Sequence, residues 1–128
     1  LFATGKESAN QIYEYLKNKR IRVAIMHGDI SRGERAKSLS MLKNAKIQVL
    51  VATDIAARGI DIKELDFVMN YDIPESTDEF THRVGRTGRA RNSGAVISLL
   101  TTKEYNRFSK IERDLKLNIK REIYAGYE

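Results

Sequence analysis

The residues with the clearest chemical potential lie between His82 and Arg91. Four arginines, Arg83, Arg86, Arg89 and Arg91, are interleaved there with two glycines, and the stretch contains no acidic residue. An arginine guanidinium is planar, permanently charged and able to bind two phosphate oxygens at once. Glycine lets backbone N–H groups approach an anion closely. These residue types indicate either a site that binds a phosphate chain or supports phosphoryl transfer, or a basic loop that faces solvent or binds nucleic acid without chemistry.

A second segment favours the first interpretation. Residues 51–62 (VATDIAARGIDI) follow an apolar run and combine small residues with one arginine and two carboxylates. Together, residues 51–62 and 82–90 (HRVGRTGRA) resemble the fifth and sixth helicase motifs of DEAD-box RNA helicases. Upstream, His27-Gly28-Asp29 and Arg35 resemble the motif between the fourth and fifth. The resemblance extends over residues 1–117, and the order and spacing of the motifs make it very specific.

The first half of a DEAD-box core has no counterpart in the sequence. There is no G-x-x-x-x-G-K-[ST] phosphate loop and no Asp-Glu-Ala-Asp run, and the chain begins inside an apolar strand candidate, Leu1-Phe2-Ala3. The resemblance therefore implies the second of two RecA-like domains, whose partner is the N-terminal RecA-like domain of the same protein. Such a domain carries half of an ATPase site and half of an RNA-binding surface. We expect no ATP hydrolysis by the chain alone.

The composition limits the size of the domain and the kinds of partner and site that it can have. At 128 residues, with 41% apolar and 31% charged residues, the chain has the size and composition of one globular domain. A net charge of +6 indicates a polyanionic partner. The absence of cysteine excludes disulfides and cysteine-ligated zinc, and with two histidines we predict no metal site within the chain. No apolar run approaches the ~18 residues of a membrane span, so we predict no membrane partner. The lack of disulfides fits a reducing cytoplasm, which is the location that we predict.

Apolar runs alternate with segments of helical spacing along the chain. The runs are short, continuous and rich in Val and Ile, which is typical of strands buried on both faces of a parallel sheet. They predict strands at 1–3, 23–26, 47–52, 67–71 and 95–100. Between the strands, apolar residues at i, i+3 and i+7 or a close variant predict helices, with the triplets Ala9, Ile12 and Leu16; Ala36, Leu39 and Leu42; and Phe108, Ile111 and Leu115.

The predicted helices have well-marked starts. Four Ser/Thr-x-x-Glu capping boxes occur, at Thr4…Glu7, Ser31…Glu34, Ser76…Glu79 and Thr101…Glu104. A strand, a turn, a capped helix and the next strand make a right-handed βαβ unit. Its repetition predicts an α/β fold, an open, mostly parallel sheet with helices on both faces. The resemblance implies a RecA-like helicase C-terminal domain over residues 1–117, with residues 118–128 as a tail or the start of a C-terminal extension.

Ligands of such sheets bind beyond the carboxyl ends of the strands, where several of the motif residues fall. The resemblance assigns Arg86 and Arg89 as catalytic arginine fingers that reach the phosphates of ATP. Gly59 and Asp61 would bind the same nucleotide, with Asp61 accepting from the ribose. The implied cofactor is ATP with Mg²⁺, the metal being held mainly by the first domain.

Two further groups of residues receive roles from the resemblance. Gly28, Arg35 and Thr53 would bind the RNA backbone, and contacts to phosphate and sugar read no sequence. His82, Arg83 and Asp54 would couple the ATP and RNA sites of the two domains. Arg83 would do so by tying the motifs together through a carboxylate such as Asp54. The alternative for Arg83 is a purely structural ion pair.

The sequence departs from the family pattern at two positions. Gly5 stands where threonine is usual in the fourth motif, which puts an RNA contact there in doubt. Arg32 stands where a glutamine usually helps to link the two domains. Neither change affects the arginine pair.

Two other functions remain open. One is a superfamily-two helicase that acts on DNA, although such families usually have glutamine in place of His82 and lack the run Ala56-Ala57-Arg58-Gly59. The other is a stand-alone RNA-binding module that uses the basic surface without ATP, against which the truncated first strand argues.

Overall fold

The computed structural model describes residues 1–58, 65–86 and 94–123. Within these residues, β1 (Phe2–Ala3), β2 (Val23–Met26), β3 (Val49–Thr53), β4 (Phe67–Asn70) and β5 (Ala95–Ser98) form one sheet in the order β2-β3-β1-β4-β5. All neighbouring strands pair in parallel. The helices are α1 (Lys6–Asn18), α2 (Arg32–Lys43), α3 (Asp54–Ala57), α4 (Thr77–Val84) and α5 (Tyr105–Leu115), with a 3₁₀ turn, η1 (Thr102–Glu104), before α5. The predicted fold class, an open parallel α/β sheet, is confirmed.

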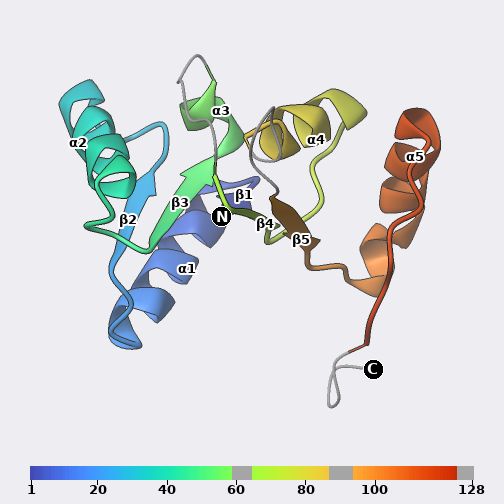
Figure 1. Ribbon diagram of the computed structural model, residues 1–128, viewed down its shortest axis with the longest axis horizontal. Helices are drawn as coiled ribbons and strands as arrows, with labels where there is room; N and C mark the ends of the chain where they lie inside the picture. The colour runs from blue at the N-terminus through green and yellow to red at the C-terminus, as the bar shows by residue number, and fades with distance from the viewer. Residues whose placement is uncertain (59–64, 87–93, 124–128) are drawn as a thin grey trace.

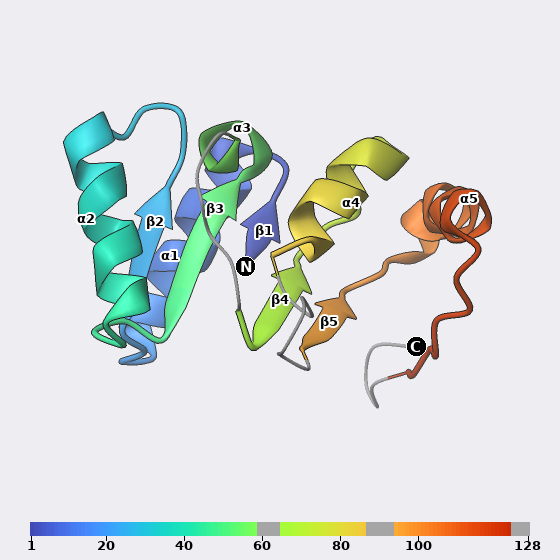
Figure 2. The ribbon, with the colours of Figure 1, turned by 45° about the horizontal axis from the view of Figure 1, so that its top comes forward.

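Helices cover both faces of the sheet, as the βαβ pattern predicts. Helices α2, α3 and α4 lie on one face, and α1 lies on the other (Figures 1 and 2). The strand residues facing α2 and α3, among them Phe2 and Leu50, form one buried cluster with Ala56 and Ala57 of α3. On the opposite face, Val51 packs with α1 in a separate cluster. The core is therefore split into two layers by the sheet.

The expectation that all strands are buried on both faces is wrong for β4 and β5. Phe67 is 67% exposed, and Tyr71, Ile97 and Leu99 are also exposed. Met69 pairs with Ile97 in register, and paired residues of parallel strands point to the same face, so these side chains lie on the face that carries α1. Helix α1 contacts β1, β2 and β3. Helix α5 lies beyond β5 and packs against α4 (Figure 2), which leaves this part of the sheet exposed.

Three of the four predicted capping positions are present in the structure, and one is not. Ser31 and Ser76 each accept a hydrogen bond from the backbone N–H of the glutamate three residues on. The box at Thr101 and Glu104 is complete. The box predicted at Thr4 is wrong, because α1 begins one residue later, with Gly5 as its N-cap and no side-chain cap. The Thr4 hydroxyl instead makes contacts far away in the sequence, which are described below.

Helix α5 packs against α4 in a small hydrophobic core that is separate from the two core layers at the sheet. Phe108 and Ile111 are buried against Ile73 and Phe80, and the rings of Phe80 and Phe108 meet edge to face, with centroids 6.1 Å apart. The segment that follows packs Ile119 against the same core. The boundary predicted at residue 117 stays a prediction. None of the described helices is both long enough and apolar enough to cross a membrane.

Candidate functional site

The parallel strands gather their carboxyl ends along one edge of the sheet. Gly28 follows β2, Asp54 follows β3, Thr4 follows β1 and Asp72 follows β4. Because the strand order is β2-β3-β1-β4, these four positions are neighbours in space although they span most of the sequence. This edge is the location at which doubly wound sheets bind ligands. It divides into two regions, one around Arg83 and one around Gly28.

Arg83 is the most buried charged side chain among the described residues, with 1% of its surface exposed. Its Nε donates to Asp54 Oδ1 at 2.7 Å and its Nη2 donates to Asp54 Oδ2 at 2.8 Å. This two-pronged pairing uses the fork of the guanidinium fully. The pairing of Arg83 with Asp54 considered from the sequence is therefore present. The part of the two residues in interdomain coupling stays a prediction.

The other donors of Arg83 reach the ends of β1 and β4. Nη1 donates to the backbone carbonyl of Asp72 at 2.7 Å and lies 3.4 Å from Asn70 Oδ1. Nη2 donates to Thr4 Oγ1 at 3.2 Å and lies 3.4 Å from Asp72 Oδ1. A buried charge is tolerated only when it is paired and fully hydrogen-bonded, and these contacts satisfy that condition.

Helices α3 and α4 are joined by contacts on either side of this ion pair. Arg86 Nη2 donates to the carbonyl of Ala57, the last residue of α3, at 3.1 Å. At the other end of α4, Arg58 pairs with Glu79. The guanidinium of Arg86 is thereby held next to α3 at the carboxyl edge of the sheet.

A narrow cleft opens between these two helices. Its volume is about 120 Å³, and it is lined by Phe2, Asp54, Ala57, Arg58, Glu79, His82, Arg83 and Arg86. Four of the residues predicted to serve nucleotide binding or coupling thus share one cleft. Pockets that enclose a small ligand measure about 300–1,000 Å³. This cleft is too small for a nucleotide by itself, so any nucleotide bound here needs a second surface.

The second region is the turn after β2. Arg35 of α2 donates from Nε to the carbonyl of Ile30 at 3.0 Å and from Nη2 to the carbonyl of Gly28 at 3.2 Å. The backbone N–H of Asp29 donates to His27 Nδ1 at 3.1 Å. Arg35, predicted to bind RNA phosphate, therefore also holds the turn that presents Gly28. Its RNA contact stays a prediction.

An ion pair links this turn to the start of α1. Lys6 Nζ lies 2.9 Å from Asp29 Oδ2 on the exposed surface. The hydrogen bond and the charge of Asp29 raise the pKa of the Lys6 ammonium, and the same contact lowers the pKa of the Asp29 carboxyl. Exposed pairs of this kind contribute little to stability.

Thr53 lies at the end of β3, between the two regions. It is the N-cap residue of α3 but makes no side-chain capping bond, and it is 4% exposed. An RNA phosphate could therefore reach only a small part of this side chain. Gly59, Asp61 and Arg89, which complete the predicted nucleotide set, lie outside the described residues.

The sequence interpretation missed several residues of the site. Thr4, Asn70 and Asp72 all bind Arg83, and none was predicted to do so. Asp72 could have been found, because it is a carboxylate just beyond a predicted strand, as Asp54 is. Thr4 could not, since its spacing to Glu7 is that of a capping box.

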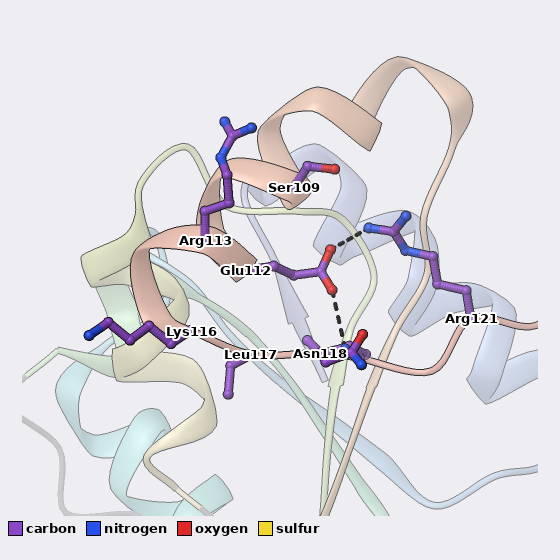
Figure 3. Close-up of a pocket in the computed structure, with 8 residues that line it drawn as sticks. Ser109, Glu112, Arg113, Lys116, Leu117, Asn118 and Arg121 are labelled. Carbon is purple, nitrogen blue, oxygen red and sulfur yellow. Dashed lines mark hydrogen bonds and ion pairs between the residues drawn. The ribbon is translucent and has the colours of Figure 1, made fainter.

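A larger hollow lies away from the carboxyl edge, between α5 and the segment after it (Figure 3). Its volume is about 570 Å³, and Glu112 binds both Arg121 and the backbone N–H of Ile119 along its wall. Figure 3 shows Arg113 and Lys116 extending away from Glu112. None of the residues predicted to be functional lines it. Within the described part of the chain, no group of three or more His, Asp or Glu side chains is placed to hold a metal.

Comparison with known proteins confirms the family that the motifs indicate. Residues 1–91 match the helicase conserved C-terminal domain family. Over its whole length the chain is 39% identical to the ATP-dependent RNA helicase SrmB of Haemophilus influenzae, of which it spans 29%.

Solved structures show the same similarity in three dimensions. A DEAD box protein from the hyperthermophile Methanococcus jannaschii has a TM-score of 0.88 and 37% identity, covering 95% of this chain and 34% of that protein. The DEAD-box protein SrmB of E. coli, solved bound to regulator of ribonuclease activity A, has a TM-score of 0.89 and 34% identity, covering 96% of this chain and 72% of that one.

Proposed function

Because this chain belongs to the helicase conserved C-terminal domain family, as the C-terminal domain of a DEAD-box RNA helicase, we propose that it supplies the second half of an ATPase site and part of an RNA-binding surface. ATP and RNA would close it against an N-terminal RecA-like domain of the same protein. Closure would bend one RNA strand and separate a short duplex.

The observation that carries this proposal is the placement of Arg86. Its guanidinium lies at the carboxyl edge of the sheet, in a cleft shared with His82, Arg83 and Asp54. Phosphoryl transfer needs positioning and charge neutralisation rather than covalent chemistry from the protein. An arginine that lines a cleft too small for a nucleotide suits a phosphate chain presented by a facing domain. Arg89 would join it as the second finger, and Gly59 and Asp61 would bind the nucleotide.

The metal of the reaction fits the facing domain better than this one. Mg²⁺ prefers carboxylate, phosphate and water oxygens. Two carboxylates line the cleft, and both are already paired: Asp54 with Arg83 through both oxygens, and Glu79 with Arg58. The described residues would thus leave Mg²⁺ to the first domain and to ATP itself, where it would neutralise phosphate charge.

The region after β2 supports the RNA side of the proposal. Arg35 fixes the turn at Gly28 and Ile30 while part of its guanidinium reaches the surface. Thr53 lies between this turn and Asp54 and is the N-cap residue of α3. An RNA strand bound at Thr53 would therefore be coupled through α3 to the cleft in which the nucleotide is proposed to bind. Contacts to phosphate and sugar would bind RNA without reading its sequence.

The proposal is tested by joining the chain to the phosphate-loop domain of its own protein. We expect RNA-stimulated ATP hydrolysis from the two-domain protein and none from the 128-residue chain, each purified identically. The control is the two-domain protein with Arg86→Ala, which should be inactive. Turnover by the isolated chain that disappears with Arg86→Ala would exclude a half-site.

A further inference from the structure

Thr4 occupies an unusual place in the network around Arg83. Its backbone N–H donates to both carboxylate oxygens of Asp72, at 3.0 and 3.1 Å, and its hydroxyl donates to Asp72 Oδ1 at 2.9 Å. The same hydroxyl oxygen accepts from Arg83 Nη2 at 3.2 Å. One hydroxyl therefore connects the carboxylate of Asp72, which follows β4, with the buried guanidinium of Arg83 on α4.

Asp72 acts on Arg83 through its backbone as well. Its carbonyl accepts one of the shortest bonds that Arg83 makes, from Nη1 at 2.7 Å. The side chain of Asp72 is held by three hydrogen bonds from Thr4, and this fixes the orientation of the peptide that carries the carbonyl. Loss of the Thr4 hydroxyl would remove one of the three bonds that hold the carboxylate, leaving the two from the backbone N–H, and would take one acceptor from the Arg83 guanidinium.

Arg83 in turn determines where Arg86 lies. Arg83 holds Asp54 at the start of α3, and Arg86 donates to Ala57 at the end of α3. Arg83 lies in the last turn of α4, Arg86 follows the C-cap residue Gly85, and both line the cleft against α3. A rotation of the Arg83 guanidinium would shift α3 against α4 and move Arg86 relative to any bound phosphate.

We propose that Thr4 and Asp72 are positioning residues for the proposed ATPase reaction, through Arg83. They hold the guanidinium of Arg83 in one orientation about its Nε–Cζ bond. This orientation in turn fixes the distance between α3 and α4. Neither residue lines the cleft that holds Arg86. This inference rests on the proposed function, because its effect appears in the rate of ATP turnover.

The test compares Thr4→Val and Thr4→Ser in the two-domain protein. Valine removes the hydroxyl at nearly constant volume, and serine restores it. Misplacement of a catalytic group by about 1 Å can cost 10²-fold in rate. We expect Thr4→Val to lower kcat about tenfold while KM for ATP and the half-saturating RNA concentration change less than twofold. Thr4→Ser should retain wild-type kcat.

A second readout follows Arg83 directly. Rotation about the Nε–Cζ bond of Arg83, measured by nuclear magnetic resonance in the 128-residue chain, should be at least about tenfold faster in Thr4→Val than in Thr4→Ser, because Nη2 loses its Thr4 acceptor and keeps only its contacts with Asp54 and Asp72. Unchanged rotation, or wild-type kcat in Thr4→Val, would overturn the positioning role. A kcat loss that serine fails to restore would do the same.

Arg86→Lys separates the two proposals. If that variant retains full ATP turnover, the arginine-finger function fails, whereas the rotation of Arg83 still decides whether Thr4 positions it. If Arg86→Lys is inactive and Thr4→Val is fully active, the proposed function stands and the positioning role is wrong.

Discussion

At the scale of single residues, the proposed function gives Arg86 and Thr53 different ligands along one edge of the sheet: ATP for Arg86 and RNA for Thr53. In the two-domain protein, Arg86→Lys should lower kcat for ATP about 10³-fold, because lysine keeps the charge but not the fork that grips a phosphate. RNA affinity without nucleotide should stay unchanged. Thr53→Val should instead raise the RNA concentration needed for stimulation. ATPase rates against RNA concentration separate the roles, and Arg86→Lys altering only RNA affinity would place Arg86 on the RNA surface.

The ion pair of Arg83 and Asp54 makes a prediction for stability. Arg83→Leu leaves the carboxylates of Asp54 and Asp72 without their cation. Removing one partner of a buried ion pair lowers the free energy of unfolding by about 3–5 kcal/mol. The double variant Arg83→Leu/Asp54→Leu should lose less free energy of unfolding than the sum of the single variants, because no unpaired charge from that pair remains. Denaturant unfolding of the 128-residue chain measures both. Additive losses would show that the pair is not coupled.

A matched control uses an ion pair on the surface. Lys110 and Asp114 form an exposed pair one helical turn apart on α5. Lys110→Ala should leave the unfolding curve almost unchanged, because exposed pairs are screened by solvent.

At the scale of elements, α5 depends on a few apolar contacts with α4. Phe108 is 2% exposed and packs on Phe80. Phe108→Ala should lower the free energy of unfolding by about 3–5 kcal/mol, from lost burial and the cavity left behind. Tyr105→Ala on the same helix, where the ring is 44% exposed, should cost much less. Chemical denaturation of the two variants checks the difference, and equal losses would contradict this account of α5.

At the scale of the whole molecule, the chain carries a net charge of +6 and only part of the proposed RNA surface. Its affinity for single-stranded RNA should be weak, insensitive to sequence, and about tenfold lower at 200 mM than at 50 mM salt, as two or three phosphate contacts would give. Fluorescence anisotropy with RNAs of different sequence measures this. Strong discrimination among sequences would favour a stand-alone RNA-binding module over a helicase half.

Local features of the chain could be predicted from the sequence alone. Strand positions agree to within two residues at each end, because short runs rich in Val and Ile leave few alternatives. The helix starts at Ser31 and Ser76 were also correct, since a capping bond spans only three residues. The motifs indicated the family for the same reason, as each motif is a continuous segment.

Only the tertiary structure decided which side chains meet. Arg83 binds Asp54, Asp72 and Thr4 across separations of 29, 11 and 79 residues. Those contacts follow from the strand order β3-β1-β4, which places three loops side by side. They also explain why Thr4 leaves its capping box, because a buried guanidinium needs hydrogen-bond acceptors more than an exposed helix start needs a cap. The exposure of β5 was decided in the same way, by the packing of α5 on α4 instead of on the sheet.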